Sequence, residues 1–351
     1  AMGALIYNDT NSDKAVCALD FGGNNACVGF LIGEPNKGLS YMFQMMNEAR
    51  IAVGLSAASI ASAAYYASLE YANERPQGRP VGNKDKSLPQ SMIIEHADVK
   101  RMLLFQKSIV EGSQSLLLQC AYYADMAKAE KEESKEIFKL VLELLTPVAK
   151  SFPSEMGILS TSAAIQIFGG AGYCQDFPAE QYFREMRIHT IHEGTTGIHA
   201  LDLLGRKIIM GGGIAFRAFT EEVSKTIKKS KLEITAMSKY GGQLDDVLFR
   251  LQNITMKLST KAMNENKEVF LADATVYLEL FGIVAIGWQW LLQANVAQKV
   301  LETDPNDKFY QSKIHTMRYY FEYELPKSEG LITKLNNSDC VTLVADKSTI
   351  I

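Results

Sequence analysis

The segment IQIFGGAGYCQDFPAEQYFREMRIHTIHEGTTGIHALDLLGRK, residues 165–207, decides how this 351-residue chain folds. It opens in an apolar helical pattern that stops at Gly169–Gly170, since glycine commonly ends helices. The proline of DFPAEQYFREM (176–186) indicates the start of a short helix. Another helix is expected from about Thr195 to Ile209. The segment therefore predicts helices joined by tight turns that contain glycine.

The turn before Thr195 carries histidines and a glutamate, which raises the question of a metal site. His189 and His192 are three residues apart, so they share a face only if this part is helical. Zinc hydrolases place two histidines four apart with a glutamate between them. Here Glu193 follows His192 and Gly194 follows at once, and no group of Asp, Glu or Cys supplies an obvious third ligand. We therefore predict no metal.

Two further interpretations of the same turn remain open. In the first, Thr195 or Thr196 caps the following helix and Glu193 lies near the positive end of that helix. In the second, Glu193 is a general base, since a carboxylate at a turn with glycine behind it can be aimed into a cleft. A carboxylate that loses its water on substrate binding is a better base for a carbon acid.

Composition limits the class of protein. With 47% hydrophobic and 22% charged residues the chain is expected to be soluble and globular, and a net charge of -4 gives no electrostatic case for nucleic acid. Five cysteines without a CxxC pair indicate reduced thiols and a cytoplasmic location, and the N-terminus lacks a signal peptide pattern. The apolar run 277–292 is shorter than the roughly 20 residues of a membrane span. It contains Glu279 and Gln289, so we predict a buried core helix and no membrane span.

Outward from the opening segment, the chain is helical in both directions. Apolar residues recur at helical spacing, interrupted by Pro147, by Ser154 as a predicted N-cap and by the glycine triplet 211–213. The predicted helices cover 39–72, 99–120, 135–152, 154–169, 214–229, 232–263, 268–300 and 307–325. In front of them, ALIY (4–7) and ACVGFLIGE (26–34) are predicted as two short strands. The prediction is an all-α chain of two consecutive helical bundles with a two-stranded remnant at the N-terminus.

The order of elements in 165–207 resembles the signature of acyl-CoA dehydrogenases. That family has Gln-x-x-Gly-Gly, then Gly-Tyr, an acidic-x-Pro turn, an Arg-containing helix and an Ile-Tyr-Glu-Gly-Thr segment. GFLIGEPNKGLSYMFQMMNEARIAVG (29–54) and YANERPQGR (71–79) are similar to the family's entry into its helical domain and its arginine-bearing cofactor loop. The resemblance implies a remnant of the middle β-domain (1–36), the C-terminal four-helix domain (37–211) and the appended helical domain of longer members (212–351).

The resemblance implies flavin-dependent α,β-dehydrogenation of an acyl-CoA thioester to the trans-2-enoyl-CoA. Glu193 matches the catalytic base that takes the α-proton, while the β-hydrogen leaves as hydride to FAD. The backbone N–H of Glu193 would help to polarise the thioester carbonyl, and Gly194 would lie beside it at the substrate. Arg50 matches an arginine that lines the acyl cavity; the alternative is a buried salt bridge with Glu48 or Glu185.

The same resemblance implies the FAD contacts. Gln166, Gly169 and Gly170 match the contact to the adenine end across a subunit boundary, and their alternative is ordinary glycine capping of a helix. Arg75 matches the arginine at the flavin pyrophosphate, again across a dimer interface, or else is a solvated residue at a helix end. Thr195 matches a flavin contact in addition to its N-cap role. Implied partners are an electron-transfer acceptor protein and further copies in a homodimer or homotetramer.

The chain departs from the family pattern in several places. His192 stands where the family usually has Tyr, Gly197 where many members have Gln, and Gly78 where many have Phe. The family's N-terminal helical domain and most of its middle β-domain precede the region matched here. Hence we expect an enzyme that needs those domains, from a longer chain or from a separate chain of a split enzyme. The alternative is a non-catalytic helical association module.

Overall fold

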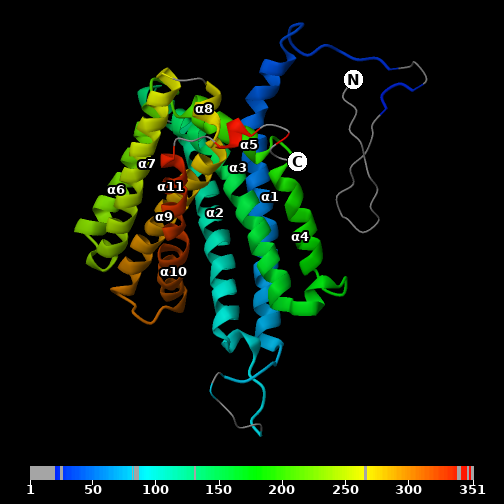
Figure 1. Ribbon diagram of the computed structural model, residues 1–351, viewed down its shortest axis with the longest axis vertical. Coiled ribbons are helices and arrows are strands. Elements are labelled where there is room, and N and C mark those ends of the chain that lie inside the picture. Colours follow the sequence, from blue (N-terminus) through cyan, green and yellow to red (C-terminus); the bar gives the residue numbers. More distant parts are fainter. Residues whose placement is uncertain are drawn as a thin grey trace.

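The computed structural model describes residues 20–23, 27–80, 82, 87–129, 132–264, 267–337, 341–345 and 348. Its regular structure is helical throughout (Figure 1). The α-helices are α1 (Gly38–Glu74), α2 (Ala97–Ala129), α3 (Glu132–Phe168), α4 (Ala179–Arg187), α5 (Thr196–Asp202), α6 (Ile214–Leu232), α7 (Ser238–Asn264), α8 (Lys267–Leu271), α9 (Ala274–Leu301), α10 (Lys308–Tyr319), α11 (Ser328–Asn336) and α12 (Val341–Val344). The 3-10 segments are η1 (Ile93–Glu95), η2 (Gly169–Tyr173), η3 (Ile188–Thr190), η5 (Thr235–Met237) and η7 (Leu325–Lys327), and the π segments are η4 (Leu203–Lys207) and η6 (Tyr320–Glu324). The all-α prediction is confirmed.

The first bundle is built on close contact between α1 and α3, with α2 and α4 beside them (Figure 1). A Cβ at Gly54 of α1 would lie 2.0 Å from the carbonyl oxygen of Ala149 in α3. Glycine therefore lets the two backbones touch. Further along, Tyr71 stacks on Phe168 with ring centroids 4.3 Å apart. The second contact lies further toward the C-terminus than the first in both helices. Hence α1 and α3 run parallel, and their C-terminal ends meet.

The second bundle surrounds α9 and shares its core with the first. Trp288 and Trp290 of α9 are buried, and α6, α7, α10 and α11 pack against this helix. The indole Nε1–H of Trp290 donates to the Ser108 carbonyl of α2 over 2.9 Å. A Cβ at Gly112 of α2 would lie 2.6 Å from the Ile286 side chain of α9. One continuous hydrophobic core therefore joins the two bundles.

The predicted break between helices at 152–154 is wrong, because α3 continues through Pro147 and Pro153. Ser154 is not an N-cap: its hydroxyl donates to the Lys150 carbonyl over 2.6 Å. A proline inside a helix costs about 3 kcal/mol because it lacks the N–H that would bind the carbonyl four residues earlier. For Pro153 that carbonyl belongs to Ala149, which lies against Gly54. Packing of α3 between α1 and α2 outweighs the lost bond.

The predicted strand at 26–34 is also wrong for its described part. Residues 27–32 lie outside regular structure, and Phe30 and Ile32 are 90% and 89% exposed. A strand is stable only beside other strands that take up its backbone N–H and C=O groups, and the described part of the chain offers none. The other predicted strand, 4–7, lies outside the described residues.

The C-terminal helices differ from their predicted bounds. The helix predicted at 268–300 divides into α8 and α9, and the one at 307–325 passes from α10 into η6 and η7. Among the described helices, Met45–Glu74 and Lys267–Leu301 are long and apolar enough to cross a membrane by length and composition. Buried core helices meet the same criteria, and 277–292 is a largely buried part of α9, as the sequence predicts.

Candidate active site at the 192–195 turn

The turn between η3 and α5 has an unusual backbone. Glu193 has φ +55° and Gly194 has φ +95°, so two successive residues adopt left-handed conformations. This region is uncommon for residues with a Cβ and is stable only when neighbouring groups fix it. Thr195 follows in extended conformation, and its hydroxyl oxygen accepts from the N–H of Ile198 at 3.5 Å. The predicted N-cap role of Thr195 is confirmed.

Two buried donors hold the carbonyl groups of this turn. The Nζ of Lys150, from the middle of α3, donates to the Gly194 carbonyl over 2.7 Å. The Nε2 of His199, one turn into α5, donates to the Glu193 carbonyl over 3.1 Å. Both side chains are fully buried. Glu193 thus lies on a turn whose two carbonyl groups both accept hydrogen bonds from the buried interior.

Burial determines the protonation of these two donors. Loss of solvation lowers the pKa of Lys150 to about 8, against the attraction of Glu155 and Glu193 and with help from Arg50. Burial, followed by the charges of Lys150 and Arg50, lowers the pKa of His199 to about 4. His199 is therefore a neutral imidazole at pH 7, and donation from Nε2 assigns its proton to that nitrogen. Lys150 remains mostly charged.

Arg50 enters the same region from α1. Its Nη1 lies 3.5 Å from Oδ2 of Asp202, and the other oxygen of this carboxylate, Oδ1, accepts from Nε of Arg206 over 2.7 Å. The predicted partners Glu48 and Glu185 are wrong. Glu48 is two residues from Arg50 on the same helix, and residues two apart do not face each other. Arg50 instead meets the end of α5, with its own Nε buried and unpartnered.

The histidine considered for a metal site has other contacts. Nε2 of His189 lies 2.9 Å from the Ser56 hydroxyl of α1, and Nδ1 lies 3.1 Å from the Glu185 carbonyl. Its ring meets that of His192 edge to face at 5.2 Å. Among the described residues, no group of three or more His, Cys, Asp or Glu is arranged to hold a metal ion. His189 fastens η3 to α1.

The residues predicted to hold FAD lie at the other end of the bundle, except for Thr195. Arg75 is exposed at the C-cap of α1, and Gln166 is exposed near the end of α3. Gly169 has φ +62°, and Cβ atoms at Gly169 and Gly170 would meet nothing within 4 Å. Gly169 directly follows the last residue of α3, so the helical rise places it about 28 Å from Lys150. One chain therefore does not bring these residues to Glu193, and their action across a subunit boundary stays a prediction.

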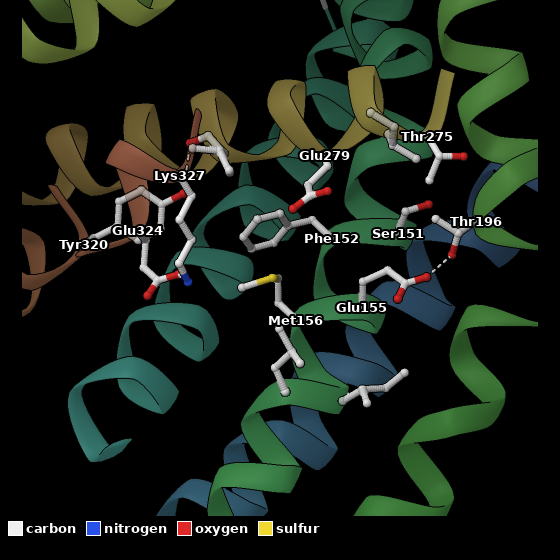
Figure 2. A pocket seen from close by; sticks show the side chains of 14 residues that line it. Ser151, Phe152, Glu155, Met156, Thr196, Thr275, Glu279, Tyr320, Glu324 and Lys327 are labelled. Carbon is white, nitrogen blue, oxygen red and sulfur yellow. Dashed lines mark hydrogen bonds and ion pairs between the residues drawn. The ribbon is translucent and has the colours of Figure 1, made fainter. Parts of the chain in front are cut away.

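A cavity of about 440 Å³ lies between α3 and α9, on the other side of α3 from α1 (Figure 2). Its floor is apolar, with Phe152, Met156 and Leu278 among the lining residues. Thr196, the first residue of α5, lines one end and donates to Glu155. No local pattern in the sequence indicates this cavity, because it forms where the two bundles meet. Glu193 is not among its lining residues.

Comparison with known proteins shows which family has this architecture. Residues 36–209 match the family described as "Acyl-CoA dehydrogenase, C-terminal domain", and residues 219–345 match "Acetyl-CoA dehydrogenase C-terminal like". The 3-methylmercaptopropionyl-CoA dehydrogenase of Ruegeria pomeroyi is 36% identical over 91% of this chain and 54% of its own length. A butyryl-CoA dehydrogenase of Syntrophomonas wolfei is 31% identical over 93% of this chain and 54% of its own length.

Solved structures share the fold. ACDH-11 of Caenorhabditis elegans in complex with C11-CoA aligns over 84% of this chain and 46% of its own, with a TM-score of 0.69 and 22% identity. An acyl-CoA dehydrogenase of Bacillus anthracis complexed with FAD aligns over 89% and 53%, with a TM-score of 0.66 and 18% identity. The chain belongs to the acyl-CoA dehydrogenase family and corresponds to its C-terminal portion. It spans about half the length of the curated relatives it matches.

Proposed function

We propose that this chain, together with the part of the fold that precedes it in its relatives, dehydrogenates an acyl-CoA thioester to the trans-2-enoyl-CoA. The observation that carries the proposal is Glu193, a half-buried carboxylate on a left-handed turn whose two carbonyls are held by buried donors. Such strain concentrates at functional sites. The relatives' names, all acyl-CoA dehydrogenases, support a thioester as substrate.

Glu193 is proposed to take the α-proton of the thioester. A carbon acid of this kind loses its proton only when its carbonyl oxygen is polarised at the same time. Among the described residues, the N–H groups of Glu193 and Gly194 donate to no backbone carbonyl. They are therefore available to that oxygen, next to the carboxylate that acts as base. Arg50, beneath the turn, is proposed to line the acyl end of the site.

The residues present suit FAD. Arg75 offers an exposed guanidinium for a pyrophosphate, and the bare backbone of Gly169–Gly170 beside Gln166 allows the close approach of a flat adenine. Thr195 would contact the flavin at the active site. When bound, FAD accepts the hydride from the β-carbon. Because these groups lie at opposite ends of one chain, a homodimer or homotetramer would supply the adenine end from a partner. An electron-transfer protein is the proposed acceptor.

The test is Glu193→Gln in the chain joined to, or mixed with, the preceding domains. Glutamine has nearly the same size but cannot accept a proton. We expect acyl-CoA to bleach the flavin of the wild-type protein and of Glu233→Gln, an exposed control on another helix end. The rate of flavin bleaching in Glu193→Gln should be lower by about 10³-fold or more. Retained bleaching in this variant would refute the assignment.

The alternative is a non-catalytic helical association module. An absorbance spectrum separates the two functions. A dimeric or tetrameric chain that takes up no FAD, alone or with the preceding domains, would favour the module.

A further inference from the structure

We infer that Lys150 and His199 are positioning residues that fix the two peptide groups between Glu193 and Thr195, so that the N–H groups of Gly194 and Thr195 face the substrate. The inference rests on the proposed role of Glu193 as base. It concerns residues for which the sequence and the family comparisons assign no function. It is carried by the two hydrogen bonds to successive carbonyls of the turn.

The geometry follows from the planarity of peptide groups. In a trans peptide the C=O and N–H bonds point in opposite directions. Donation by His199 to the Glu193 carbonyl therefore turns the Gly194 N–H away from His199. Donation by Lys150 to the Gly194 carbonyl likewise turns the Thr195 N–H away from α3. Since both donors are buried beneath the turn, both N–H groups are directed to its open side.

The bonds also change what these N–H groups can do. A carbonyl that accepts a hydrogen bond polarises its peptide group, which strengthens the N–H at the other end as a donor. The bond from the charged Lys150 does this more strongly than a neutral donor. The two buried residues thus orient and activate N–H groups adjacent to the proposed base.

Gly194 is part of the same arrangement. Its φ of +95° is unfavourable for any residue with a Cβ, and a Cβ there would lie 3.1 Å from Nε2 of His199. Only glycine therefore allows both the backbone conformation and the approach of the imidazole. A side chain at this position would displace His199 from the Glu193 carbonyl.

The burial of Lys150 is itself informative. A lysine without solvent costs free energy that only partners within reach can offset. The carboxylates of Glu155 in α3 and Glu193 in the turn attract its ammonium group, and Arg50 of α1 repels it. The neutral imidazole of His199 in α5 lies beside it. A methionine would fill the same space without a charge. Packing alone therefore does not explain the ammonium group at this position, whereas its hydrogen bond to the Gly194 carbonyl does.

The test uses a feature of the sequence: the pair Gly-Thr occurs once, at 194–195. Labelling glycine at its carbonyl with ¹³C and threonine with ¹⁵N gives one HNCO peak, which reports the Gly194 carbonyl and the Thr195 N–H together. We expect the carbonyl shift of the wild-type chain to titrate with a midpoint of about 8, as Lys150 loses its proton. Lys150→Met should move the carbonyl upfield and abolish the titration.

The matched control is Lys139→Met, which removes an exposed lysine from the same helix and should leave the peak and its titration unchanged. A wild-type peak that does not titrate between pH 6.5 and 9.5 would overturn the inference, and it needs no variant to fold. So would a Lys150→Met spectrum that coincides with that of the wild type.

Activity in the assembled enzyme provides the second measurement. We expect Lys150→Met to lower kcat about 10- to 100-fold with little change in KM, since misplacing reacting groups by 1 Å has effects of this size. An unchanged kcat, where Glu193→Gln is inactive, would overturn the positioning role alone. Activity of Glu193→Gln would overturn the proposed function, while the HNCO titration would still test the two hydrogen bonds.

Discussion

Replacing His199 by glutamine should remove a specific source of acid sensitivity from this fold. The glutamine amide can still donate to the Glu193 carbonyl, but it does not titrate. In the wild-type chain, burial lowers the pKa of His199 from 6.5 to about 4. Between these two pH values, the His199 side chain is therefore protonated in the unfolded chain but not in the folded chain. Stability is lost as the pH falls from about 6.5 to about 4.

The magnitude follows from the two pKa values. A difference of one unit corresponds to about 1.36 kcal/mol, so the full contribution of His199 is about 3 kcal/mol. Relative to pH 7, linkage gives a loss of about 1 kcal/mol at pH 5.5 and about 2.4 kcal/mol at pH 4.5. At pH 7 itself, His199→Gln should cost about 1 kcal/mol through imperfect packing. The variant should thus become the more stable protein in acid.

The assay is guanidinium unfolding followed by circular dichroism at pH 7, 5.5 and 4.5. The control is His315→Gln, an exposed histidine of α10, which should follow the wild-type acid profile. The comparison uses differences between variants at each pH, so groups that titrate equally in both proteins cancel. Parallel pH profiles for the wild type and His199→Gln would refute the assignment of His199 as a buried neutral imidazole.

Two further substitutions test the packing that positions the site. Gly54→Ala should destabilise the chain by about 2–3 kcal/mol or more, because its Cβ would meet the Ala149 carbonyl at 2.0 Å; Gly38→Ala, on the same helix with nothing near its Cβ, should lower the melting temperature little. Glu143→Leu should cost about 3 kcal/mol, because it leaves the buried Lys207 without its partner at 2.7 Å; adding Lys207→Met should restore most of the loss, and a double variant no more stable than Glu143→Leu would contradict this reasoning.

The sequence predicted the helices because apolar periodicity depends on neighbours close in the chain. The turn at Glu193, the cap at Thr195 and the helix end at Gly169 follow from the same local chemistry, and all three positions are as predicted. The break at Pro153 was wrong because contact with Gly54, about a hundred residues earlier, keeps α3 continuous.

The buried positions of Lys150 and His199 could not be predicted, for a related reason. Each lies within a largely apolar helical pattern, LLTPVAKSF (144–152) and GIHALD (197–202), where a polar residue suggests a solvated position. The available signal was a lysine in the apolar stripe of a helix, which requires a buried partner. Which partner that is depends on how α3 and α5 meet. The Arg50–Asp202 pair could not be predicted for the same reason, because the two residues lie 152 positions apart in the sequence.

The continuity of α3 has a consequence for how the site is completed. Lys150, beneath the proposed base, lies on α3, which continues without a break to Phe168, the residue before Gly169 at the proposed adenine contact. Lys150 and Gly169 are held about 28 Å apart with little freedom. A single copy therefore presents the base at one end and the predicted cofactor groups at the other, and we propose that a second copy joins the two. If so, Arg75→Ala in one subunit should weaken FAD retention at the site containing Glu193 of its partner. Mixed dimers of Arg75→Ala and Glu193→Gln should then carry one site with both defects and one intact site, with about half of wild-type bleaching. Complete inactivity of such mixed dimers, or an active monomer that retains FAD, would show that the site is completed within one chain.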